Sequence, residues 1–291
     1  MTITFTENIL NTRYRDDYLD SDNYYRILFN KGKALQAREL TQMQTILQKQ
    51  IERFGRNIFK EGASVVPGGA TLDDLVEFVK LNTTTNALPT DGSEINETFT
   101  GQNSGVKVRV LSSAAATGSD PATLFVTYTN TLSGTTGSTP IRLSPAEDIV
   151  GDNTGTTLTV QTTNTGSNPA VGKGVKFSIS EGSFFVNGFF VYAETQSLII
   201  SKYTPDVTIE VGFKIVQEIV TADDDSGLYD NSGSVPNTTA PGADRYRIKL
   251  ILTTKDDVDS DETFVYLAKL VNSEIRDVVT GFNQYNKIND L

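Results

Sequence analysis

The chain has 291 residues, 37% of them hydrophobic, and its 25 basic and 36 acidic residues give a formal net charge of −11. It contains no cysteine and no histidine, which excludes disulfides, thiolate nucleophiles, zinc sites built on cysteine and Ser-His-Asp triads. The acidic balance and the lack of a basic cluster argue against nucleic acid as a partner.

The length suits one large or two modest domains with a buried core. The opening MTITFTENILNTRYRDDYLD has no basic end followed by an apolar run. No run of about 18 apolar residues occurs either, so we expect neither a signal peptide nor a membrane span. Nothing in the sequence calls for a cofactor, and we expect none.

The first segment, residues 1–82, contains the one long helical pattern, KGKALQARELTQMQTILQKQIERFGRNIF at positions 31–59. Apolar residues recur there every three or four positions, which predicts a helix over 34–58 with one apolar face. That face must be buried, because its side chains gain about 1.5 to 3 kcal/mol each on leaving water. After the helix, Val76 and Phe78 indicate a strand.

The same helix can be written as heptads, in which Leu40, Leu47 and Phe54 share one seam position. Gln36, Met43 and Gln50 occupy the other, and polar seam residues are known to fix register and oligomer number. We therefore predict a homo-oligomer interface. The alternative is an amphipathic helix that lies on the sheet of its own chain. Because the apolar stripe of this helix is wider than a heptad seam, the helix can also pack on its own sheet and on partner chains at once. The predicted interface residues are Gln36, Leu40, Met43, Leu47, Gln50, Ile51, Phe54 and Ile58.

The second segment, residues 83–172, is rich in Thr, Ser, Asn and Gly and poor in charge. The stretches VKVRVL, TLFVTYTN and TLTVQTT alternate apolar and polar residues, the period of half-buried strands. Val126, Tyr128, Leu158 and Val160 are the residues expected to be buried. We predict an inserted β domain here rather than a low-complexity linker.

The third segment, residues 173–291, contains SFFVNGFFVY, in which Asn187-Gly188 predicts a tight hairpin turn. The further stretches TIEVGFKIVQEIVT, RYRIKLILTT and TFVYLAKLVNSEIRDVV read as strands. The predicted fold class is therefore α+β and mainly β. It comprises one long helix with a small sheet, the inserted β domain, and a C-terminal β region that packs with the first segment.

Two stretches of this segment are candidate sites. Asp223, Asp224, Asp225 and Asp230 with Gly227 offer oxygen ligands for calcium, but their spacing does not fit the twelve-residue calcium loop, so turns capped by Asp side chains are favoured. The loop VPNTTAPGADR is stiff and rich in turn residues, and we predict a protein contact there, with a simple turn as the alternative. Its contact residues are Pro241, Gly242, Asp244 and Arg245.

An enzymatic reading is not favoured. Glycoside cleavage needs two carboxylates about 5 to 10 Å apart, and no pair of acids stands out beside the aromatics. Five aromatic residues cluster in the hairpin, and alternate members of such a hairpin are expected in the core of a sheet rather than on a sugar platform. The five are Phe184, Phe185, Phe189, Phe190 and Tyr192.

Three stretches carry a resemblance to a known family. YYRILFNKGKALQARELTQMQTILQKQIERFGRNIFKEGASVVPGG, EGSFFVNGFFV and TADDDSGLYDNSGSVPNTTAPGADRYRIKL resemble tailed-phage virion proteins, which are baseplate or tail-fibre components met most often in contractile-tailed phages of cyanobacteria. The Thr/Gly-rich middle carries little of this resemblance. Members usually continue beyond the equivalent of GFNQYNKINDL, so the resemblance implies a shorter member or the N-terminal part of a longer protein.

The resemblance implies a structural subunit of a phage tail in the virion, made in the host cytoplasm, trimeric, docked to other baseplate or tail proteins, and without catalytic residues. One alternative is a receptor-recognition module whose middle β domain binds host-surface glycans. A polysaccharide-degrading tail enzyme is a third hypothesis.

Overall fold

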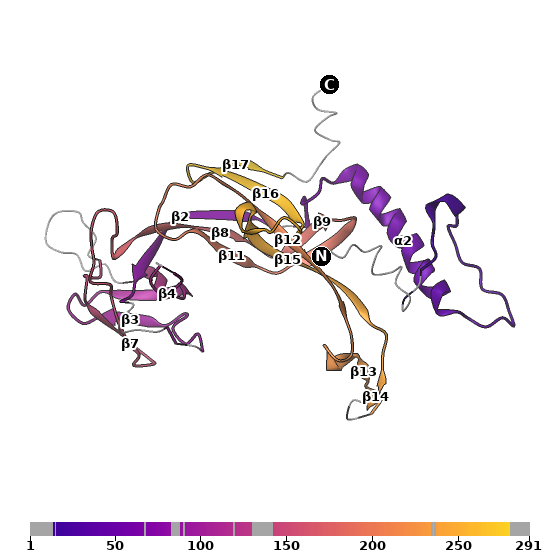
Figure 1. Cartoon of the computed structure of the whole chain (residues 1–291), viewed down its shortest axis with the longest axis horizontal. Coiled ribbons are helices and arrows are strands. Elements are labelled where there is room, and N and C mark those ends of the chain that lie inside the picture. The colour runs from indigo at the N-terminus through magenta and orange to yellow at the C-terminus, as the bar shows by residue number, and fades with distance from the viewer. Residues whose placement is uncertain are drawn as a thin grey trace, which may run out of the picture. The chain divides into compact units, whose positions relative to one another are not determined.

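A computed structural model describes residues 14, 16–66, 68–82, 88–89, 91–118, 120–129, 142–233, 235 and 237–279. The predicted fold class is confirmed: the protein is mainly β, with antiparallel sheets and one long helix (Figure 1). In the part of the chain that the structure describes, no helix has the length and apolar character needed to cross a membrane.

The chain divides into two compact units. Unit 1 comprises residues 1–71, 178–198 and 208–291, and unit 2 comprises residues 72–177 and 199–207. The segment predicted as an inserted β domain, 83–172, lies inside unit 2, which extends further at both ends and includes a short return segment.

Unit 1 contains the long helix and three sheets. The strand orders are β1-β9-β10, β15-β12-β16-β17 and β13-β14. The helices are α2 (Ala37–Ile58) and the single 3-10 turns η1 (Asp20–Asp22), η2 (Ser226–Leu228) and η3 (Lys255–Asp257). The strands are β1 (Ser64–Val66), β9 (Gly182–Val186), β10 (Phe189–Ala193), β12 (Ile209–Val220), β13 (Tyr229–Asp230), β14 (Asn237–Pro241), β15 (Arg245–Thr254), β16 (Phe264–Val271) and β17 (Glu274–Val278).

The hairpin predicted at Asn187-Gly188 is confirmed. Strands β9 and β10 pair antiparallel from Phe189 opposite Val186 to Ala193 opposite Gly182. Asn187 and Gly188 between them have φ values of 51° and 82°, the positive values that a two-residue turn of this kind requires.

Helix α2 packs against this hairpin through a narrow face of mixed chemical character. Thr45, Ile46 and Gly55 are its buried residues. A Cβ added to Gly55 would lie 2.3 Å from Cε2 of Phe185, so only glycine lets the helix backbone approach the ring this closely. The helix starts at Ala37 rather than at residue 34, because Gln36 is extended and its N–H donates to the Glu39 side chain at 3.0 Å.

Strand β12 is the centre of the four-stranded sheet. It pairs with β15 along ten residues, from Val211 opposite Thr254 to Val220 opposite Arg245, and with β16 on its other side. Phe213 is fully buried and its ring centroid lies 4.8 Å from that of Phe184 on β9. Beyond the paired region, the connection between β12 and β15 carries the ribbon of β13 and β14 (Figure 1).

An eight-stranded sheet, in the order β11-β8-β2-β5-β4-β3-β6-β7, supplies most of unit 2. Val126, Leu158 and Val160, expected to be buried, are 2% exposed or less. Burial raises the pKa of the Tyr128 hydroxyl to about 12. The strands are β2 (Ala70–Lys80), β3 (Thr98–Gly101), β4 (Lys107–Ala114), β5 (Thr123–Tyr128), β6 (Asp148–Gly151), β7 (Thr157–Thr159), β8 (Val171–Ile179) and β11 (Gln196–Ser201).

Two hairpins of this sheet share one sequence motif. A glutamate from each hairpin accepts hydrogen bonds from the turn of the other. The motif, Glu-x-x-x-Gly-x-Asn-Ser/Thr-Gly, begins at Glu97 and again at Glu147. The Glu97 carboxylate accepts a hydrogen bond from the backbone N–H of Asn153 at 2.6 Å, and the Glu147 carboxylate accepts one from that of Asn103 at 2.8 Å. Each glutamate therefore holds the turn of the other hairpin, across the antiparallel pair β3 and β6.

These carboxylates replace water as acceptors for backbone N–H groups. Glu97 and Glu147 are 6% and 0% exposed, and buried N–H groups left without acceptors are costly. The hydrogen bond from the Asn153 N–H is the main reason why the pKa of Glu97 lies below its ordinary value. The two hairpins are locked to each other.

We expect Gly55→Val to lower the free energy of unfolding of unit 1 by about 1 to 3 kcal/mol, because the added side chain overlaps the Phe185 ring. Urea unfolding followed by the helical circular dichroism signal measures this change. Asn57→Val is the matched control, since Asn57 is an exposed residue of the same helix and the two residue types have similar helix propensity. Equal midpoints for the two variants would contradict this account of helix docking.

We expect Glu147→Gln to destabilise unit 2 by about 1.5 to 3 kcal/mol, the value of hydrogen bonds to a charged group. Both carboxylate oxygens of Glu147 accept hydrogen bonds, Oε2 from the N–H of Ser144 at 2.8 Å and Oε1 from that of Asn103 at 2.8 Å. The NH₂ group of a glutamine would therefore face a backbone N–H donor at either position. Hydrogen–deuterium exchange at Asn103 and Ser104 should accelerate. Asp148→Asn, at an exposed neighbouring carboxylate, is the control and should leave the amides of Asn103 and Ser104 protected. If Glu147→Gln leaves them protected too, the hydrogen bonds to the Glu147 carboxylate do not stabilise the turn.

Candidate functional site

The outer face of α2 is the most extensive apolar surface that the helix presents. Leu47 and Phe54 are 57% and 64% exposed, although both are large apolar residues. Leu40, Met43 and Ile51 lie along the same stripe and are exposed as well. Exposed apolar surfaces of this kind mark sites where another molecule binds.

This face is the predicted heptad seam. Of its eight residues, Gln36, Leu40, Met43, Leu47, Gln50, Ile51 and Phe54 are exposed and Ile58 is half-buried. The helix thus meets its own chain through Thr45, Ile46 and Gly55 and leaves the seam uncovered within the described chain. Whether the seam is an interface between copies remains a prediction. The segment before α2 adds more exposed apolar residues, namely Tyr24, Tyr25, Leu28, Phe29 and Leu35.

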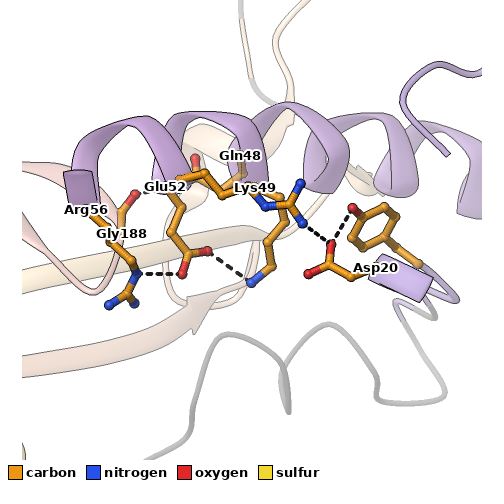
Figure 2. A network of polar contacts seen from close by, with 8 residues as sticks. Asp20, Gln48, Lys49, Glu52, Arg56 and Gly188 are labelled. Carbon is orange, nitrogen blue, oxygen red and sulfur yellow. Dashed lines mark hydrogen bonds and ion pairs between the residues drawn. The ribbon is translucent and has the colours of Figure 1, made fainter. Parts of the chain in front are cut away.

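A line of ion pairs runs along α2 beside its buried face (Figure 2). Glu52 accepts from Lys49 Nζ at 3.0 Å and from Arg56 Nε at 2.9 Å. Burial alone would raise the pKa of the Glu52 carboxyl, but these two cations outweigh it and hold the pKa below its ordinary value. Gln48 Nε2 donates to the carbonyl of Gly188 at 2.9 Å, which ties the helix to the hairpin turn.

The chain before α2 is attached to the helix by acidic side chains. The buried Asp16 carboxylate accepts a hydrogen bond from the Thr45 hydroxyl. Asp20 accepts from Arg53 Nη2 at 2.7 Å and from the Tyr18 hydroxyl at 2.6 Å (Figure 2). The hydrogen bond from Tyr18 is the largest contribution that lowers the pKa of Asp20. These contacts attach residues 16–20 to the side of α2.

The predicted contact loop borders a cavity of about 1000 Å³ inside unit 1. Pro241, Gly242 and Arg245 are exposed, and Asp244 is half-buried. The other walls come from α2, including Thr41 and Gln44, and from the ends of β12 and β15.

The loop is held by hydrogen bonds to other segments of unit 1 and by one within the loop. The Gly242 N–H donates to the carbonyl of Leu228 at 2.7 Å, and the Asp244 carboxylate accepts from the Tyr14 hydroxyl at 2.5 Å. Arg245 Nη1 donates to the backbone carbonyl of Ala243 at 2.5 Å. The loop is thus a rigid rim of the cavity, and its role as a protein contact stays a prediction.

The acidic cluster that suggested calcium caps turns instead. Asp224 accepts from the N–H of Thr221 at 3.0 Å, and Asp225 accepts from the N–H of Gly227 at 2.9 Å. Asp230 bonds the N–H of Ser232 in the same way. Within the described ranges, no three His, Cys, Asp or Glu side chains are grouped so that they could hold a metal ion.

Sequence reasoning missed the paired glutamates and a buried lysine, Lys80. The repeated Glu-x-x-x-Gly-x-Asn-Ser/Thr-Gly motif was the signal for Glu97 and Glu147. Lys80 is 4% exposed at the end of β2, and nothing in its local sequence marks it as buried.

Comparisons with known proteins gave one family match. Searches of curated proteins and of solved structures found no match to this chain. A family model described as "Domain of unknown function (DUF4815)" matches residues 12–85 and 154–288. The matched residues include α2 and the C-terminal sheet of unit 1, whereas residues 86–153 lie outside the match. The match covers more than half of the chain, and the protein therefore belongs to the DUF4815 family.

Proposed function

We propose that this protein is a structural subunit of a phage tail, a baseplate or tail-fibre component of the virion. In this proposal it assembles as a homotrimer through the outer face of α2 and docks other tail proteins. The proposed role is mechanical and requires no catalysis and no cofactor. The setting in a phage tail rests on the resemblance of the three quoted stretches to tailed-phage virion proteins.

The exposed seam of α2 is the observation that carries the assembly proposal. The helix already has a partner on its inner face, where Gly55 meets Phe185. Its apolar outer face is not covered by the part of the chain that the structure describes. Each large side chain there gains about 1.5 to 3 kcal/mol on full burial by another molecule.

The polar residues of the seam favour copies of the same chain as partners. Gln50 lies among the apolar residues of the seam and is exposed. Gln36 is the N-cap of α2, and its side-chain oxygen accepts a hydrogen bond from Arg38 Nε at 2.7 Å. Around a symmetry axis, like residues meet at the same level, so glutamines can hydrogen-bond one another and fix the register and the number of chains.

Docking of other tail proteins is assigned to the loop Pro241–Arg245. Rigid loops carried by a sheet commonly make protein contacts, and this loop is fixed by the hydrogen bonds of Gly242 and Asp244. It belongs to unit 1, as α2 does, so assembly and docking would use one unit.

We expect light scattering to give the purified chain a molar mass three times its 31.7 kDa, and Leu47→Asp to reduce that mass to one chain. A charge in the seam of each copy would be buried against two others, which is strongly unfavourable. Circular dichroism should be unchanged, because Leu47 is 57% exposed within its own chain.

Leu75→Asp is the matched control, because Leu75 on β2 is 56% exposed and has the same side chain. It should leave the trimer intact. A wild-type monomer, or a trimer that survives Leu47→Asp, would show that α2 is not the assembly device.

A further inference from the structure

Unit 2 contains a polar cavity of about 700 Å³ that the assembly proposal does not use. Its size is within the range of small-molecule sites. The walls come mainly from the end of β2, from the segment 161–169 and from Tyr203 and Thr204 in the segment 199–207 of unit 2. We call it the Lys80 cavity, after the buried cation among its lining residues.

Lys80 is a buried cation that makes no ion pair among the described residues, although the Asp120 carboxylate is near enough to favour its charged form. Its Nζ lies 2.7 Å from Asn168 Oδ1 and 4.0 Å from the centre of the Tyr203 ring. Asp120 also lines the cavity, but its carboxylate pairs with Lys202 at 3.0 Å. An ammonium group has three N–H donors, and a buried charge is costly unless it is paired. Burial accordingly lowers the pKa of Lys80.

Gln161 contributes an unused acceptor to the same cavity. Its backbone N–H donates to the carbonyl of Lys80 at 2.8 Å, so the two residues are neighbours. Its side-chain Oε1 is buried and has no hydrogen-bond donor within the described part of the chain. An unsatisfied buried acceptor calls for a donor from a ligand or a bound water. The hydroxyl-bearing residues Thr162, Thr163 and Thr204 complete this polar lining.

We propose that the Lys80 cavity binds a carboxylate-bearing saccharide, a uronate, with the carboxylate on Lys80 Nζ and a sugar hydroxyl donating to Gln161 Oε1. One buried cation matches one carboxylate, and the hydroxyls and amides of the walls match the other sugar hydroxyls. A phosphate dianion fits less well, because the Asp120 carboxylate lines the same cavity. This binding goes beyond the assembly role.

Isothermal titration calorimetry of the full chain tests the proposal. The probes are oligosaccharides of glucuronate, galacturonate and mannuronate, a neutral glucose oligosaccharide of the same length, and inorganic phosphate. We expect heat from at least one uronate and none from the neutral sugar or phosphate. Binding should persist at 0.3 M salt (about twice physiological ionic strength), because a buried pair is screened less than surface charges.

Two variants locate the site. Lys80→Met keeps the length of the aliphatic stem and removes a buried charge, so it should fold, and it should weaken uronate binding about tenfold or more. Gln161→Glu has nearly the same shape and places a negative charge beside the ligand carboxylate, with a loss of similar size. Lys107→Met is the matched control, because Lys107 lies on β4 outside the cavity and pairs with Asp152.

The outcomes separate this proposal from the assembly proposal. Lys80→Met should keep the molar mass of the wild type, and Leu47→Asp should keep uronate binding. The proposal is overturned if no uronate binds, if phosphate or the neutral sugar binds equally well, or if the folded Gln161→Glu and Lys80→Met variants bind like Lys107→Met.

Discussion

The close contact between Gly55 and the Phe185 ring decides which side of α2 faces its own chain. A larger residue at position 55 would turn the helix or push it away, since a Cβ cannot occupy that space. The hydrogen bond from Gln48 to the carbonyl of Gly188 adds a second attachment of this face to the hairpin, and the ion pairs of Glu52 stabilise the helix itself. The apolar seam on the opposite side is exposed as a geometrical consequence, and the assembly proposal depends on it.

Unit 2 is stabilised by a different interaction, the reciprocal hydrogen bonds between the glutamates and the turns of two similar hairpins. Glu97 and Glu147 each satisfy backbone N–H groups of the other turn, so the hairpins stabilise each other rather than themselves. The sheet built in this way also carries the lining of the Lys80 cavity. The two units thus use separate means of stabilisation and offer separate surfaces, an apolar helix face in one and a polar cavity in the other.

Local patterns predicted much of this fold, and long-range contacts account for what they missed. The period of α2, the Asn187-Gly188 turn and the alternation in β5 and β12 are all set by neighbouring residues. On the helix face that meets the hairpin, Ile46 widened the predicted apolar stripe, but Thr45 and Gly55 gave no signal because neither belongs to such a stripe. Likewise, no window around Glu97 shows that its partner is Asn153, although the repeated motif indicated that the two hairpins are related. The burial of Lys80 depends on segments distant in sequence.

The discontinuity of unit 1 has a consequence for the order of folding. Residues 72–177, most of unit 2, are synthesised after α2 and before the hairpin of β9 and β10 on which α2 packs. A helix in a protein gains most of its stability from tertiary packing, so α2 becomes firmly structured only after the hairpin on which it packs has been made. The contacts that position the apolar seam therefore form only after residues 182–193 have been synthesised.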